Sequence, residues 1–307
     1  METKKAIKKS KVKKQMKAIK QDDEGIKPSG TLYIVGTPIG NLKDITLRAI
    51  ETLQNVDVVL AEDTRQTLKL LNHLKISKHL VSYHKFNEVD KISNVVELLE
   101  SGKNVALVSD AGMPIISDPG ENLVKYLITE GYNIETIPGV TAITTAIIQS
   151  GLDSSRFAFE GFLNTNKKQR KLRLESLVNE SRTIIFYEAP HKILNTLKDL
   201  YQYLGDRKIC IARELTKLYE EYKYLKISEA IELLSNSTIK GEIVLLVEGK
   251  SQEDIKNEEI KIIADISNIE LVKKYISEGL DKKEAVKKVA KLKNINKNDV
   301  YKECLEI

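Results

Sequence analysis

The chain has 307 residues, 41% of them hydrophobic, which is enough for two domains of ordinary size and an appendage. No apolar run approaches the roughly 20 residues that a membrane span requires, and the start lacks the apolar core of a signal peptide. Two cysteines make neither a disulfide framework nor a metal site, so we expect a reducing, cytoplasmic environment.

The net charge of +5 is unevenly distributed along the chain. Residues 1–20 carry +8 and residues 271–307 carry +4, whereas residues 21–270 carry −7. A partner with phosphates is therefore expected to bind the two ends through salt-dependent contacts. The alternative is that the Lys-rich start is a solvated, disordered tail, because lysines outnumber arginines 41 to 8 throughout the chain.

Five β-favouring segments alternate with helical segments in the first half of the chain. This alternation predicts a mainly parallel sheet that helices cover on both faces. The strands are expected at Thr31–Val35, Val56–Leu60, His79–Ser82, Val105–Val108 and Asn133–Ile137. The first helix is expected at Ile45–Leu53, and the other four end at Leu74, Leu99, Thr129 and Ser150.

The unusual residues follow the C-terminal end of each predicted strand, whereas the loops that precede the strands are ordinary. In open α/β sheets, ligands bind outside the carboxyl ends of the strands, where the strand order reverses. The sequence therefore predicts which edge of the sheet binds a ligand. In the first of these loops, Pro38 stands where a dinucleotide fingerprint needs a second glycine, so an ordinary dinucleotide site is not expected.

The loop after the fourth strand, from Ser109 to Glu121, is acidic. It contains Asp110 and Asp118, and the first cation after it is Lys125. A phosphate site needs glycines with a lysine or arginine, so this loop is a poor phosphate site. It suits a cationic ligand, or one that is recognised through ribose hydroxyls and a purine ring.

The end of the same loop has the residues of a helix start. Asp118 suits the N-cap, Pro119 the first helical position and Glu121 a capping box. We therefore expect the segment from Asp118 to Glu121 to hold the loop in position.

Gly151–Ser155 is predicted to be a hinge, after which a second set of strands begins. Fewer helices separate these strands, so the second sheet is expected to be mixed. The strands are predicted at Arg156–Phe159, Thr183–Phe186, Lys208–Ala212, Tyr222–Lys226 and Ile243–Glu248, with helices that end at Val178, Leu204 and Leu234.

The last part of the chain is predicted to be a linker, residues 249–264, and three short helices at Leu271–Glu278, Lys282–Leu292 and Asn298–Leu305. This small basic unit could contact RNA or pack as a lid, and its charge slightly favours RNA. We predict four parts: a basic disordered tail (1–29), two α/β domains (30–151 and 152–250), and a linker with a small helical domain (251–307).

Short motifs lie along the body at residues 36–42, 61–65, 82–84, 109–114, 116–120, 137–139, 159–163, 187–191, 212–217 and 240–242. Each motif is weak alone, but their order and spacing are very specific. Together they resemble the tetrapyrrole methylase family, in particular its branch that modifies small-subunit ribosomal RNA. Met113 departs from the family's usual small residue, which would narrow the pocket.

The resemblance implies two α/β domains with S-adenosylmethionine in the cleft between them, and a homodimer. It also implies methyl transfer to the ribose 2′-hydroxyl of a cytidine in the decoding region of 16S rRNA. The residues that it assigns to the methyl donor are Gly36, Pro38, Gly40, Asp110, Gly112, Met113, Pro114, Ile115, Pro138, Thr141, Ala142, Leu163 and Tyr187.

A ribose hydroxyl is a very weak acid, so some group should accept its proton. No residue is uniquely marked for this role. The candidates at the cleft edge are Asp63, His84, Glu88, Glu188 and Lys217. Asp63 could instead cap a helix, His84 could be structural, and Glu188 could serve a helix dipole.

Basic residues are the candidates for holding RNA phosphates: Arg65, Arg213, Lys282 and Lys283. The histidines form no metal pattern with a cysteine or a pair of carboxylates, so no metal site is expected.

Two other functions compete with RNA methylation. A tetrapyrrole methylase of the same fold would not need basic ends, and an inactive ribosome-binding protein would not need intact loops after all five strands.

Overall fold

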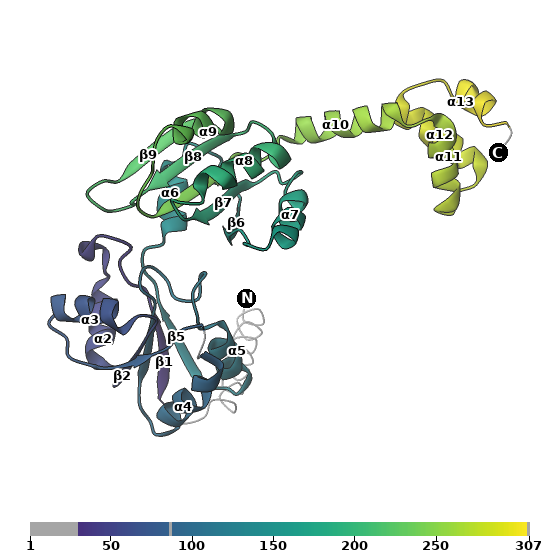
Figure 1. Cartoon of the computed structure of the whole chain (residues 1–307). Helices are drawn as coiled ribbons and strands as arrows, with labels where there is room; N and C mark the ends of the chain where they lie inside the picture. Colours follow the sequence, from purple (N-terminus) through teal and green to yellow (C-terminus); the bar gives the residue numbers. More distant parts are fainter. Residues whose placement is uncertain (1–29, 86–87, 306–307) are drawn as a thin grey trace, which may run out of the picture.

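The computed structural model describes residues 30–85 and 88–305, without the side chains of residues 88–90, 258, 259 and 262. The predicted basic tail, residues 1–29, lies outside the described residues. Figure 1 shows two α/β units, and a helical arm that leads from the second unit to a small C-terminal unit.

The first sheet has five strands in the order β3-β2-β4-β1-β5, and every neighbouring pair is parallel. This confirms the predicted parallel sheet. The strands are β1 (Thr31–Val35), β2 (Val58–Ala61), β3 (His79–Ser82), β4 (Val105–Val108) and β5 (Asn133–Ile137). The central strands β2 and β4 are buried throughout, as expected of a sheet covered on both faces.

Two helices cover each face of this sheet. One face packs against α2 (Leu47–Asn55) and α3 (Thr64–His73), and the other against α4 (Glu88–Glu100) and α5 (Glu121–Thr129). The chain leaves β1 towards β2 and leaves β4 in the opposite direction towards β5. Strand order therefore reverses between β4 and β1, which are neighbours, and their two loops meet there.

The predicted N-cap of α5 is wrong. This helix begins at Glu121, and Gly120 is its N-cap residue, with φ of 126° and no side-chain cap. Before it, Ile115 and Ser117 have φ of 77° and 73°, in the left-handed region that non-glycine residues rarely adopt. These turns keep Asp118 outside the helix, so its carboxylate does not cap it.

The helix after the fifth strand, α6 (Ala142–Gln149), packs on the second sheet. Ile143, Ala146 and Ile147 share a core cluster with Val244 and Leu246. Packing therefore groups α6 with the second unit, although the predicted hinge follows this helix.

The second sheet is mixed, as predicted. Its order is β6-β7-β10-β8-β9, with β6 parallel to β7 and all other neighbours antiparallel. Three helices cover the face opposite α6. The strands are β6 (Phe157–Phe162), β7 (Thr183–Glu188), β8 (Lys208–Arg213), β9 (Glu221–Lys226) and β10 (Ile243–Val247), and the helices are α7 (Lys167–Ser176), α8 (Ile193–Leu204) and α9 (Ile227–Ser235).

The predicted linker is a helix, α10 (Gln252–Asp265), which forms the arm in Figure 1. The three predicted terminal helices are present as α11 (Asn268–Ser277), α12 (Lys282–Lys293) and α13 (Lys297–Glu303). They have a core of their own around Leu271, Val286 and Val300. None of the helices in the described part of the chain is long and apolar enough to span a membrane.

The packing of α6 is tested by two adjacent isoleucines. Ile147 is 4% exposed against the second sheet, whereas Ile148 is 81% exposed. Ile147→Ala leaves a cavity and should lower the free energy of unfolding by about 2–5 kcal/mol. Ile148→Ala, the matched control, should change it by less than about 0.5 kcal/mol. Urea unfolding followed by circular dichroism measures both, and equal effects would contradict this packing.

Candidate active site

The loops after β1 and β4 are joined by backbone hydrogen bonds. The N–H of Thr37 donates to the carbonyl oxygen of Gly112 at 2.8 Å, and the N–H of Gly112 donates to that of Thr37 at 3.1 Å. The buried Thr37 hydroxyl adds a bond to the carbonyl oxygen of Ser109, at 3.3 Å. The two loops therefore form one wall.

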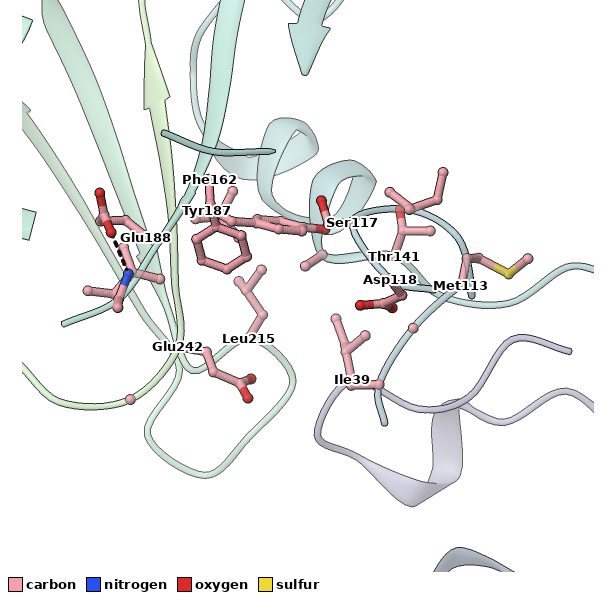
Figure 2. Close-up of a pocket in the computed structure, with 18 of the residues that line it drawn as sticks. Ile39, Met113, Ser117, Asp118, Thr141, Phe162, Tyr187, Glu188, Leu215 and Glu242 are labelled. Carbon is pink, nitrogen blue, oxygen red and sulfur yellow. Dashed lines mark hydrogen bonds between the residues drawn. The ribbon is translucent and has the colours of Figure 1, made fainter. Parts of the chain in front are cut away.

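A pocket of about 370 Å³ lies between this wall and the second unit. Figure 2 shows first-unit residues such as Ile39 and Asp118 facing second-unit residues such as Tyr187, Leu215 and Glu242. The first unit contributes Ile39, Ala111, Gly112, Met113, Ile116, Ser117, Asp118, Thr141 and Ala142. The second contributes Phe162, Tyr187, Glu188, Ala189, Pro190, Leu215, Gly241, Glu242, Ile243 and Val244.

The residues assigned to the methyl donor divide into two groups. Gly112, Met113, Thr141, Ala142 and Tyr187 line the pocket. The others are not among the residues that line it: Gly36, Pro38, Gly40, Asp110, Pro114, Ile115, Pro138 and Leu163.

Gly36 belongs to the second group because it lets two loops approach each other. A Cβ at Gly36 would lie 2.6 Å from the sulfur of Met113 and 2.8 Å from the Cα of Gly139. Such distances are far below van der Waals contact, so only glycine fits here. The Met113 side chain therefore packs against Gly36.

Leu163 is buried in the core between the second sheet and its helices. Its neighbour Phe162 lines the pocket instead and is 61% exposed. The ring of Phe162 meets that of Tyr187 edge-on, with centroids 5.6 Å apart. The two rings are labelled in Figure 2 and give the pocket a partly solvated aromatic surface.

Asp118 is the half-buried carboxylate of the pocket's first-unit wall, and in Figure 2 it points towards the middle of the cavity. Burial raises its pKa to about 6; the nearby charge of Asp110 also raises it, while a hydrogen bond with Ser109 lowers it. Burial and the charge of Asp118 similarly raise the pKa of Tyr187 to about 12. This wall therefore favours positive charge.

Two further acids stand behind Asp118. Burial, together with the charges of Asp118 and Asp110, raises the pKa of Glu62 to about 6. The Asp110 carboxylate accepts a hydrogen bond from the N–H of Asp63 at 3.0 Å, which ties the loop after β4 to the loop after β2. Burial raises the pKa of Asp110 as well.

Asp63 is already paired. It caps α3 by accepting from the N–H of Arg65, and it binds the Arg65 guanidinium through both oxygens, at 3.0 and 2.6 Å. Hydrogen bonds from Arg65 lower the pKa of Asp63 to about 2. Such a weakly basic carboxylate is a poor proton acceptor.

Lys217 is also paired. Its ammonium donates to Glu214 at 2.9 Å and to Glu242 at 3.0 Å. Burial alone would lower the pKa of Lys217, but the hydrogen bonds to these two glutamates raise it. A lysine held in its charged form cannot accept a proton.

The remaining candidates lie in three different settings. Glu188 is 5% exposed in the pocket floor, where it accepts hydrogen bonds from the N–H of Ala189 and from the hydroxyl of Thr196. His84 follows the edge strand β3 and is not among the residues that line the pocket. Glu88 is the first residue of α4, and its side chain lies outside the described residues.

The residues predicted to hold RNA lie apart from the pocket lining. Arg65 is bound to Asp63, and Arg213 is bound to Glu221 at 3.0 Å. Lys282 and Lys283 lie at the start of α12 in the C-terminal unit. In the described part of the chain, no group of three or more His, Cys, Asp or Glu residues could hold a metal ion.

Comparison with known proteins identifies the family. Residues 31–231 match the model of the Tetrapyrrole (Corrin/Porphyrin) Methylases. The chain belongs to the tetrapyrrole methylase family. Two similar proteins come from Bacillus subtilis (strain 168), at 48% identity over 89% of this chain and 93% of that protein, and Thermotoga maritima, at 50% identity over 72% and 99%. Both are named ribosomal RNA small subunit methyltransferase I.

Solved structures of tetrapyrrole methylases share the fold. The uroporphyrin-III C-methyltransferase of Thermus thermophilus, complexed with S-adenyl homocysteine, has a TM-score of 0.53 at 20% identity, over 71% of this chain and 97% of that chain. A cobalt precorrin-4 methyltransferase has a TM-score of 0.56 at 19% identity, over 71% and 94%. The predicted class of two α/β domains is thereby confirmed.

The pocket residues that sequence analysis did not assign to the site include Asp118, Phe162 and Glu242. Glu242 is part of the motif at 240–242 but was assigned no role.

The close approach at Gly36 provides a test of the pocket wall. In Gly36→Ala, the added methyl group should displace Met113 and weaken the binding of S-adenosylmethionine, the donor that the resemblance implies, at least tenfold in calorimetry. Gly205→Ala is the control, since a Cβ there meets no atom within 4 Å and only its φ of 79° is strained. Unchanged binding in Gly36→Ala would show that the wall tolerates the displacement.

Proposed function

We propose that this chain transfers the methyl group of S-adenosylmethionine to the ribose 2′-hydroxyl of a cytidine in the decoding region of 16S rRNA. The enzyme would act in the cytoplasm as a homodimer, with the small ribosomal subunit RNA as its partner. The observation that carries the proposal is an acid-lined pocket between the two units of a tetrapyrrole methylase whose relatives, at 42–50% identity, are named for this RNA.

The pocket suits the proposed donor in size and charge. Its volume, about 370 Å³, is within the usual range for a small-molecule site, and no lysine, arginine or histidine is among the described residues that line it. Asp118, Glu188 and Glu242 supply negative charge, while Ile39 and Leu215 supply apolar surface. S-adenosylmethionine carries its reactive methyl group on a positively charged sulfur, and it has an adenine ring that apolar surface can cover.

The chain's part in the reaction is mainly positioning. Gly112, Met113, Thr141, Ala142 and Tyr187 would hold the donor between the two walls. A correctly placed hydroxyl reacts as if it were present at very high concentration, an effect worth up to roughly 7–11 kcal/mol. The exposed ring of Phe162 at the same pocket is suited to stack on the target nucleobase.

The main test uses labelled S-adenosylmethionine and purified small ribosomal subunits. We expect label to enter 16S rRNA and to protect the bond beside a single cytidine from alkaline cleavage, because that cleavage needs a free 2′-hydroxyl. Free 16S rRNA, assayed in parallel, determines which form is the substrate.

Two outcomes would replace this proposal. Methyl transfer to uroporphyrinogen, with none to RNA, would make the chain a small-molecule methylase. Binding to the subunit without S-adenosylmethionine binding in calorimetry would make it an inactive ribosome-binding protein.

The C-terminal unit is expected to add phosphate contacts. Lys282 and Lys283 begin α12, and Lys283 is exposed. Replacing both with glutamine should reduce the slope of log affinity against log salt by about 1–2, as expected for two lost phosphate contacts. Filter binding at several salt concentrations between about 50 and 200 mM measures this slope.

A matched control removes two lysines elsewhere. Lys125 on α5 and Lys198 on α8 are exposed, and their double glutamine variant should keep the slope of the unmodified chain. Equal slopes in all three proteins would mean that the C-terminal unit does not contact phosphates.

A further inference from the structure

We propose that helix α7 (Lys167–Ser176) binds the phosphate backbone of the RNA beside the nucleotide that is methylated. This role rests on the proposed function, and it falls to a helix for which sequence analysis predicted no contact with RNA. Three observations support it: the charge of α7, the division of its cations into anchored arginines and exposed lysines, and its place next to the pocket.

The charge of α7 is unusual for its surroundings. Five of its ten residues are lysine or arginine and one, Glu175, is an acid, so the helix carries +4. Residues 21–270, which include α7, carry −7 in total. Among the other described helices of the two α/β units, none exceeds +2, the charge of α3. A compact cationic surface on an acidic body attracts polyanions, most strongly at low salt.

One arginine of α7 connects the helix to the pocket floor. The Arg170 guanidinium donates to Asp199 at 2.6 Å and to the Thr196 hydroxyl at 2.9 Å, both on α8. The Thr196 hydroxyl donates in turn to the carboxylate of Glu188, which lines the pocket. Because Thr196 is fully buried and Arg170 is mostly buried, these hydrogen bonds hold α7 in a fixed position relative to the pocket floor.

The other arginine connects α7 to the strand that carries Phe162. The Arg173 guanidinium binds both oxygens of the Glu160 carboxylate, at 2.5 and 2.7 Å, and the Glu160 side chain is only 5% exposed. Glu160 and Phe162 both belong to β6. The two arginines therefore anchor α7 within the second unit, which leaves its lysines to contact RNA.

The three lysines of α7 are exposed. Lys171 comes four residues after Lys167 and three after Lys168, so the three ammonium groups share one side of the helix. Within the described part of the chain, only Lys171 forms an ion pair, with Glu175 at 3.7 Å, and such an exposed pair contributes little. The ammonium groups of Lys167 and Lys168 can therefore bind phosphates without breaking an ion pair.

The start of α7 is close to the pocket. Phe162, which lines the pocket, comes five residues before Lys167, and five residues span at most about 18 Å. The turn between them is held by side chains: Asn164 accepts from the N–H of Asn166 at 2.8 Å, and Asn166 caps α7 by accepting from two N–H groups of its first turn. A ribose in the pocket would therefore have its neighbouring phosphates within reach of Lys167 and Lys168.

The segment that follows α7 contacts the start of the C-terminal arm. The N–H of Lys250, just before α10, donates to the carbonyl oxygen of Glu180 at 2.7 Å, and its ammonium donates to Asn179 at 3.2 Å. Figure 1 shows α7 and the arm on the same side of the second unit. The side of the molecule that carries α7 is thus also the side from which the basic C-terminal unit extends.

The first experiment removes two charges from α7. Lys167→Gln/Lys168→Gln should lower the affinity for 16S rRNA about tenfold near 0.1 M salt, and should reduce the slope of log affinity against log salt by about 1–2, as expected for two lost phosphate contacts. In methylation assays, KM should rise by a similar factor while kcat stays unchanged, because a phosphate contact is equally strong before and during the reaction.

Two further variants make this result specific. Lys75→Gln/Lys103→Gln removes the same charge from exposed residues that precede β3 and β4, at the edge of the first sheet opposite the pocket, and should leave affinity, slope and KM unchanged. Lys167→Arg/Lys168→Arg keeps the charge and should recover most of the lost affinity. Calorimetric affinity for S-adenosylmethionine should be equal in all variants, which shows that the pocket is intact.

Crosslinking tests the position of α7 on the RNA. Both natural cysteines are buried, so a photoreactive maleimide should attach to the new thiol of Lys168→Cys. We expect crosslinks to 16S rRNA within about ten nucleotides of the methylated cytidine, because about 18 Å spans roughly five phosphates at about 3.4 Å each and the reagent adds to this reach. Lys103→Cys, treated in the same way, should give no crosslinks in this region.

Three results would overturn the inference. The glutamine variant of α7 could bind 16S rRNA with the affinity and slope of the control. It could bind free 16S rRNA normally yet lose affinity for assembled subunits, in which case α7 contacts a ribosomal protein. Crosslinks could also be confined to RNA far from the methylated cytidine. In all three cases the unmodified chain still methylates 16S rRNA, and the proposed function fails only if it does not.

Discussion

The backbone pairing of Thr37 with Gly112 is the contact on which the pocket depends. It is possible because strand order reverses between β4 and β1, so that loops leaving neighbouring strands meet at one edge. Once they are joined, the Gly36 backbone touches that of Gly139, and the loops after β1, β4 and β5 form a continuous wall. A side chain at either glycine would separate them.

The opposite wall is set by the loop after β8, whose geometry is also strained. Glu214 and Thr216 have φ of 51° and 63°, and Lys217 bridges Glu214 to Glu242. This loop closes on the first unit at Gly40, where a Cβ would lie 2.5 Å from Lys217. The ion pairs of Lys217 therefore join two loops of the second-unit wall, a role that fits its charged state better than proton transfer does.

Much of the fold was predictable because it follows from local periodicity. β1, β3, β4 and β5 have the predicted bounds, and the binding edge follows from parallel strands alone. Two features depend on backbone irregularities that periodicity does not encode. One is the register shift in β6 between Phe159 and Gly161. After this shift, Phe162 lines the pocket and Leu163 lies in the core. The left-handed turns at Ile115 and Ser117 move Asp118 from a helix start to the pocket.

The same acidity that suits a sulfonium constrains how RNA can approach. Under the proposed function, Asp118 would repel phosphates, so a strand would have to approach the donor with a ribose edge inward and its backbone outward. The described pocket lining offers that backbone no cation, and the two arginines predicted to hold RNA, Arg65 and Arg213, are bound to acids. Under the proposed function, most of the affinity for RNA would then have to come from outside the pocket.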